Sequence, residues 1–283
     1  RLSPAVVFMI DWRHWHNEPI LIGGLVLLGW LYAILTGPLR RYLAPAEPYP
    51  VRKACWFYAA LLSFYIAVGS PLDQIGERFL LSAHMVQHHI MTYGSALMIL
   101  LGIPAWAVDP LLNKRGFRTI FRVLLSPMIC AFVFALVMSV WHAPKLYDWA
   151  LQDKNIHVIE HVMFFAVSLM WWWPVASPSK VRPKLSYGYQ IVYLLVGTVL
   201  MIPVFAFIAF SDNVLYPTYE YAPRLIDGFM PMDDQLLGAV VMKMGGMSVT
   251  SVAIIVAFYR WYRESEGRRS TSPKSLKAHP ASQ

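Results

Sequence analysis

Seven apolar stretches dominate this chain of 283 residues, and each is long enough, or nearly so, to cross the roughly 30 Å hydrocarbon core of a membrane as a helix. Hydrophobic residues make up 57% of the chain and charged residues 14%, against about 25% charged in soluble domains. The sequence therefore predicts an all-α, polytopic membrane protein with seven transmembrane helices, and it excludes a soluble globule or a disordered chain. The predicted spans are Ile20–Thr36, Ala54–Ser70, Phe79–Trp106, Ile120–Trp141, Ile156–Val175, Tyr187–Phe210 and Leu236–Trp261.

Basic residues are divided unevenly between the two sides that these spans create. Seventeen lie in the loops and tail that follow spans one, three, five and seven, and six lie on the other side. Cytoplasmic loops of membrane proteins are enriched in Lys and Arg, so the N-terminus is predicted to be outside and the C-terminus inside. The net charge of +8 then reflects topology and contact with lipid, and it predicts no nucleic-acid partner.

Three regions follow from this topology. Residues 1–17 form an outer N-terminal segment, residues 18–261 form the membrane domain, and residues 262–283 form a basic cytoplasmic tail that we expect to be disordered. The longest outer loop, Ser211–Asp233, contains four aromatic residues and three prolines, and we expect it to pack as a lid.

Eight of the nine histidines fall on the predicted outer side of the membrane. His84 and His88 are four residues apart near the start of the third span, and His157 and His161 are four apart at the start of the fifth, with Glu160 between them. Residues four apart share a helix face, and at 1.5 Å per residue all four histidines lie within roughly the first 15 Å of their spans. We expect the two pairs to converge if the third and fifth helices are neighbours.

Four imidazoles and a carboxylate at one depth are typical of a transition-metal site. Imidazole suits Cu, Zn, Fe and Ni, and the thioethers of Met85, Met91 and Met163 nearby favour copper, with zinc as the alternative. Ionisable residues inside a membrane are costly, which itself favours a functional interpretation.

Three other interpretations of the histidines remain open. They can be buried polar groups that bond across helices, and His89, about 100° around the helix from His88, fits that role best. The string from His157 through Glu160 to His161 matches the H-x-x-E-H signature of a zinc hydrolase. Bis-histidine haem ligation for electron transfer needs only one histidine from each helix.

Several strings, in order, resemble the CtaG family of cytochrome c oxidase assembly factors, the seven-span family linked to caa-type oxidases. The resemblance covers about residues 15–260. The strings are Ser70–Asp73, Ser82–His88, Leu101–Pro104, Trp141–Asp148, His157–His161, Trp172–Pro174, and Asp234-Gln235 followed by Met242.

The resemblance implies a non-enzymatic metallochaperone in a bacterial cytoplasmic membrane that helps to mature a haem–copper oxidase by delivering copper. Its partners would be oxidase subunits in the same membrane and a soluble copper donor on the outer side. Lys243 departs from the family pattern, and we expect it to pair with an acidic group or with backbone carbonyls. The implied metal positions are His84, His88, His157 and His161, with His142, Glu160 and Asp234 close by.

Overall fold

The computed structural model of the chain describes residues 15 and 17–271, and within these residues it contains helices and no strands. The first half forms α2 (Pro19–Thr36), α3 (Arg40–Leu43), α4 (Val51–Gly69), α5 (Pro71–Arg78), α6 (Leu81–His89), the π-helix η1 (Ile90–Ser95), α7 (Ala96–Gly102), α8 (Ala105–Asn113) and α9 (Arg115–Leu124). The second half forms α10 (Pro127–Trp141), α11 (Pro144–Gln152), α12 (Lys154–Ala176), α13 (Tyr187–Leu200), α14 (Ile202–Ala209), α15 (Pro217–Glu220) and α16 (Pro231–Thr271).

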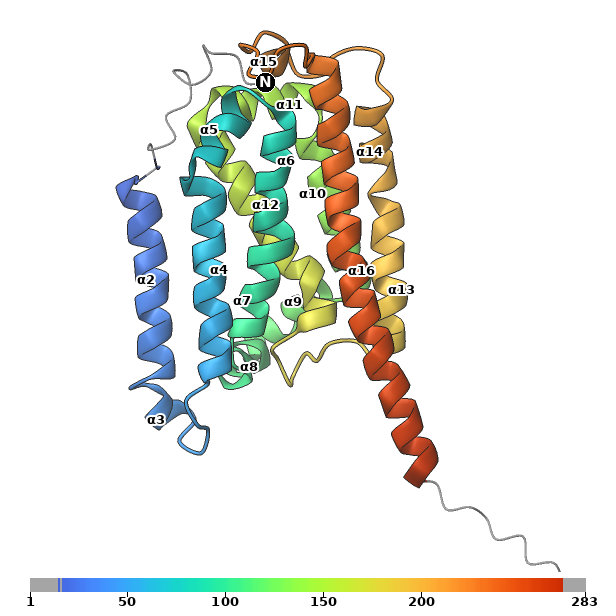
Figure 1. Cartoon of the computed structure of the whole chain (residues 1–283). Coiled ribbons are helices and arrows are strands. Elements are labelled where there is room, and N and C mark those ends of the chain that lie inside the picture. Colours follow the sequence, from blue (N-terminus) through green and yellow to red (C-terminus); the bar gives the residue numbers. More distant parts are fainter. Residues whose placement is uncertain (1–14, 16, 272–283) are drawn as a thin grey trace, which may run out of the picture.

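The long helices run side by side, and short helices close the two ends of the bundle (Figure 1). Helices α5, α11 and α15 lie at one end, which we call the α15 end, and α3 and α8 lie at the other. In the predicted topology the α15 end faces outside. Beneath α15, buried Tyr147, Tyr216 and Tyr219 pack with Leu81 and Met85 into one apolar cluster.

The number of membrane-crossing helices agrees with the polytopic prediction. Five elements are long and apolar enough to cross by themselves: α2, α4, α12, α13 with α14, and α16. Two further spans are bent pairs, with an angle of 90° between Leu81–Gly102 and α8 and of 66° between α9 and α10. Counting each bent pair as one span gives seven.

Prolines explain why the third and fourth spans are shorter than predicted. Pro104 and Pro127 stand just beyond the two bends, and the residue before a proline is pushed out of the helical region. The third span therefore ends at Gly102 rather than Trp106, and the fourth crosses from Pro127 rather than Ile120.

The C-terminal region differs from the expected disordered tail. Helix α16 continues without a break from Pro231 to Thr271, ten residues past the predicted end of the membrane domain. Glu, Arg and Lys are good helix formers, and the Tyr262 hydroxyl adds a bond of 2.8 Å to the Glu266 carboxylate one turn on. The rest of the tail, and nearly all of the predicted N-terminal segment, lie outside the described residues.

A π-helix interrupts the third span directly after the histidines. In η1 the Thr92 hydroxyl donates to the His88 carbonyl at 2.6 Å, and the Ser95 hydroxyl donates to the Ile90 carbonyl at 3.2 Å. Single π turns are rare and frequently lie at functional sites. Met91 and Ser95, within this turn, are fully buried.

Candidate metal centre

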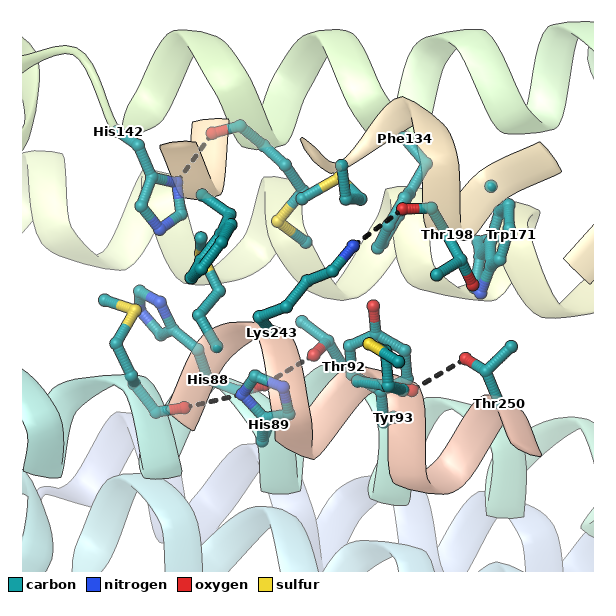
Figure 2. A pocket seen from close by; sticks show the side chains of 18 residues that line it. His88, His89, Thr92, Tyr93, Phe134, His142, Trp171, Thr198, Lys243 and Thr250 are labelled. Atoms are coloured by element: carbon teal, nitrogen blue, oxygen red, sulfur yellow. Dashed lines mark hydrogen bonds between the residues drawn. The ribbon is translucent and has the colours of Figure 1, made fainter. Parts of the chain in front are cut away.

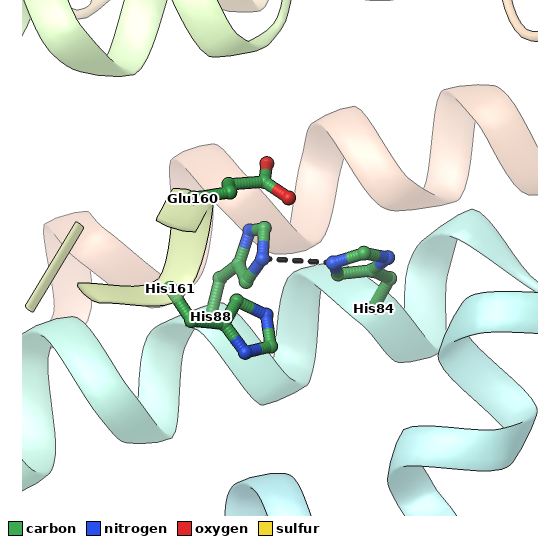
Figure 3. A group of neighbouring side chains, drawn as sticks. All are labelled: His84, His88, Glu160 and His161. Carbon is green, nitrogen blue, oxygen red and sulfur yellow. Dashed lines mark hydrogen bonds between the residues drawn. The ribbon is translucent and has the colours of Figure 1, made fainter. Parts of the chain in front are cut away.

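Two histidines of α6 and two residues of α12 meet at the α15 end of the bundle. His84, His88, Glu160 and His161 each offer one ligand atom, and these four atoms lie within 4.8 Å of one another (Figure 3). All four side chains are buried, and His84 and Glu160 have no exposed surface. We call these four residues the cluster. The side chains of the third and fifth spans therefore meet as the paired spacing predicted.

The space for the cluster comes from how the two helices pack. Helix α12 packs closely on α10 and α7, whereas α6 packs on α16 and α5, so the imidazole rings fill the gap between α6 and α12. The ring centroids of His88 and His161 are 5.3 Å apart, and those of His84 and His161 are 6.1 Å apart.

Local capping sets the register of both helices. Asp153 begins α12, because its carboxylate accepts hydrogen bonds from the backbone N–H groups of Asn155 and Ile156 at 2.8 and 3.3 Å. Helix α6 has no cap of its own, and Asp234 of α16 supplies one instead. Its two oxygens accept from Leu81 N at 2.6 Å, from Ser82 N at 3.1 Å and from Ser82 Oγ at 2.5 Å.

Asp234, which the family resemblance implied to be close to the metal, therefore has a structural role as the cap of α6. Both of its oxygens are engaged, and it lies outside the cluster. The buried carboxylate holds α6 against α16 at the turn that precedes His84.

Tyr219 fixes the proton of His84. The Tyr219 hydroxyl donates to the Gly76 carbonyl at 2.7 Å and lies 3.1 Å from His84 Nδ1. Because its only proton goes to Gly76, the hydroxyl accepts from Nδ1–H, so His84 Nε2 carries the lone pair of the ring and faces His88 Nε2 at 2.8 Å. Proteins orient a metal-binding imidazole by a hydrogen bond from its other ring nitrogen to a neighbouring group.

The tyrosines above the cluster stay protonated. Burial raises the pKa of the Tyr219 and Tyr147 phenols well above their usual range, and their oxygens are 3.3 Å apart. Gly76 lets α5 pack closely against α6, since a Cβ at this position would lie 3.0 Å from the His84 Cα. The Ser211–Asp233 loop thus covers the cluster through Tyr216 and Tyr219, in line with the expected lid.

His157 lies beside the cluster and is held in the same manner. Its Nδ1 is 2.6 Å from the Glu77 carboxylate, its ring centroid is 4.1 Å from that of His161, and its buried Nε2 has no hydrogen-bond partner among the described residues. It is not one of the four residues whose ligand atoms converge. The structure thus puts this predicted ligand next to the cluster.

Several buried polar atoms of the cluster have no hydrogen-bond partner in the described part of the chain. They are both carboxylate oxygens of Glu160 and His161 Nε2. An unsatisfied buried polar group costs about 1–3 kcal/mol, and native proteins rarely gather several in one place. A metal ion would satisfy lone pairs of this kind, so the donor set fits a transition metal.

The other histidines have separate roles. The His142 imidazole binds the Met138 carbonyl at 2.6 Å through Nδ1, and its ring lies 6.4 Å from that of His88, outside the cluster. His89 bonds the Met85 carbonyl at 2.8 Å, stacks on Tyr93 and packs against the glycines of α16, which fits the structural role favoured by its position on the helix.

Sequence patterns did not single out Glu77, Tyr147 or Tyr219. Tyr147 lies in the string Trp141–Asp148, which carried a weak signal as part of the family resemblance. Glu77 and Tyr219 are 80 and 135 residues away from the histidines they touch, so no local spacing marks them.

Lys243 is paired with the backbone, as expected. Its ammonium donates to the Thr198 carbonyl at 3.0 Å, near the end of α13. Pro203 starts the next helix without an N–H, so carbonyls at this break need another donor.

A family model for cytochrome c oxidase caa3 assembly factors matches residues 30–264. The chain belongs to this family. The match spans the described membrane domain from α2 to α16 and confirms the resemblance seen in the motifs. No curated protein matches the chain, and no solved structure does either.

Proposed function

We propose that this assembly factor binds copper in the cluster and delivers it to a haem–copper oxidase in the same membrane. The observation that carries the proposal is the convergence of three imidazoles and one carboxylate within 4.8 Å, several of their atoms lacking any other described partner. The family supplies the acceptor, since it serves cytochrome c oxidase.

Copper is the favoured metal because an assembly factor must first bind its metal ion and then release it to the acceptor protein. A donor site has to hold its cargo without the strong thiolates that would retain it, and neither free cysteine, Cys55 or Cys130, belongs to the cluster. Neutral imidazoles bind copper well and release it to a better-defined acceptor. Zinc is the alternative cargo, because the same donors suit it.

The residues that cover the cluster indicate from which side copper would enter. Tyr147, Tyr216 and Tyr219 seal the α15 end, so a soluble copper donor on the predicted outer side would load the cluster through the Ser211–Asp233 loop. The basic loops at the other end predict that this end faces the cytoplasm, and the caa3 oxidase family supports the bacterial cytoplasmic membrane as the location.

The geometry supports the non-enzymatic proposal over the two other chemistries. A zinc hydrolase needs a substrate next to its metal, and the cluster is buried on every side. Bis-histidine haem ligation needs room for a porphyrin between one histidine of each helix, whereas the ligand atoms of His84, His88 and His161 lie with that of Glu160 within 4.8 Å of one another. Purified protein without a Soret band and with bound copper would support the copper site directly.

The test is the double variant His88→Ala with His161→Ala. It should lose stoichiometric copper binding and still fold, because helix association in a bilayer rests mainly on packing. Cells that carry it should accumulate an oxidase without activity, partly rescued by excess copper. His279→Ala, in the predicted tail, is the matched control and should behave as wild type.

Two results would overturn the proposal. One is full copper occupancy in the folded double variant, and the other is normal oxidase activity when that variant replaces the wild type. Tightly bound zinc together with hydrolysis of lipid or peptide would instead show that the protein is a zinc hydrolase.

A further inference from the structure

A pocket adjoins the cluster and shares one residue with it, His88. Residues of α6, η1, α10, α12, α13, α14 and α16 line the pocket, which has a cavity of about 50 Å³. This volume is several times the roughly 10–15 Å³ that one water needs. Figure 2 shows His88 and His142 toward one end of the pocket, Thr198 and Trp171 toward the other, and Lys243 between them with its ammonium pointing toward Thr198.

The donor atoms of the pocket are softer than those of the cluster. Five of the chain's 14 methionines line it, and none of its lining residues is a carboxylate or a cysteine. The five methionines are Met85 of α6, Met138 of α10, Met201 between α13 and α14, and Met242 and Met247 of α16. Thioethers with imidazole favour Cu(I), whereas a carboxylate suits harder ions.

Two buried imidazole nitrogens at the His142 end have no partner among the described residues. His142 donates Nδ1–H to the Met138 carbonyl, so its Nε2 is a bare lone pair, and that atom is buried and unpartnered. His88 Nδ1 is also buried and unpartnered. The two ring centroids are 6.4 Å apart, close to the separation of two imidazoles that bind one ion from opposite sides at about 2.0 Å per nitrogen.

The positive charge of Lys243 is held away from that end. The ammonium is held by the Thr198 carbonyl near the C-terminal end of α13, where the helix dipole is negative. Figure 2 shows this bond away from His142 along the pocket.

We propose that His142 and His88, with the methionines around them, form a second metal position that holds monovalent copper beside the cluster. The proposal rests on the proposed function, because the cluster is the source of the ion. Copper moves between the two positions without a change of oxidation state, as His88 offers Nε2 toward His84 and Nδ1 as the remaining nitrogen.

The experiment counts Cu(I) bound to the purified full-length protein. Cu(I) is supplied anaerobically with ascorbate in competition with bathocuproine disulfonate, and bound copper is examined by X-ray absorption for sulfur neighbours. The wild type should bind two Cu(I) ions with a clear sulfur contribution. His142→Phe should bind one ion, and the sulfur contribution should be lost.

Methionine variants separate ligation from folding. Met138→Leu combined with Met242→Leu keeps apolar volume and leaves His142 in place, so it should fold and weaken the second ion at least tenfold. Met128→Leu, at an 84% exposed position outside the pocket, should bind two ions as the wild type does.

The outcomes distinguish this inference from the proposed function. One Cu(I) in the wild type, no sulfur neighbours, or a second ion retained in both pocket variants would overturn the second position. If His84→Ala with His161→Ala leaves copper binding unchanged, the cluster proposal fails instead.

Discussion

The two faces of α6 use the same kinds of residue for opposite purposes. Toward α16, both Asp234 oxygens accept hydrogen bonds from the backbone of α6, His89 bonds the Met85 carbonyl through Nδ1, and the helices pack closely. Toward α12, His88, His161 and Glu160 have buried atoms that no described residue satisfies. A polar residue in a membrane helix therefore indicates function only after its partners are counted. We therefore expect the face toward α12 to govern metal binding and the face toward α16 to govern stability.

The largest effect is expected at the α12 face. His161→Leu removes one ligand and should weaken copper binding by more than about 100-fold, because even a residue that only orients a ligand is worth 10–100-fold. The metal-free variant should be at least as stable as wild type, since an unsatisfied buried group is replaced by an apolar one. Copper titration and thermal unfolding in detergent measure both. An unchanged copper affinity would show that the α12 face does not govern metal binding.

Asp234→Ala tests the α16 face. It leaves the backbone N–H groups of Leu81 and Ser82 without their acceptor, and the free energy of unfolding should fall by about 2–3 kcal/mol. Copper stoichiometry of the folded protein should stay the same. Asp227→Ala, at an exposed position of the preceding loop, is the matched control. Loss of copper without loss of stability would instead make Asp234 a ligand.

Tyr219→Phe acts on the cluster through His84 alone. Without the hydroxyl, His84 Nδ1–H loses its acceptor, and copper affinity should fall roughly tenfold while binding stays stoichiometric. Tyr221→Phe, an exposed residue of the same loop, should leave the affinity as it is. Equal affinities for the two variants would show that the lid does not orient the imidazole.

Gly245→Ala should give the smallest change. An added Cβ would lie 2.7 Å from the His89 ring, and the strain, partly offset by the better helix propensity of Ala, should cost about 1 kcal/mol of stability. Gly24→Ala in α2 meets no atom within 4 Å and should stabilise slightly. A larger loss for Gly24→Ala would contradict the close packing of α6 on α16.

The sequence predicted the features that depend on local geometry. Histidines four apart share a helix face, so the meeting of His84 and His88 with His161 followed from two pairs at equal depth. Long apolar runs predicted the spans, and the family resemblance was confirmed by the match over residues 30–264. The orientation of the termini stays a prediction from the basic residues.

Features that depend on tertiary contacts left no local pattern. The Glu77 contact to His157, the Tyr219 contact to His84 and the π turn at Ile90 arise from how α5, α15 and α6 pack. The family resemblance implied Asp234 as a position close to the metal, whereas the structure engages both of its oxygens as a helix cap.

The most direct test of the central claim is copper K-edge X-ray absorption of the wild type loaded with one equivalent of copper, beside His161→Leu. The cluster predicts the scattering of about three imidazoles with one carboxylate oxygen, and one imidazole fewer in the variant. Copper without imidazole scattering, or an identical spectrum from the variant, would contradict a metal centre built from His84, His88, Glu160 and His161.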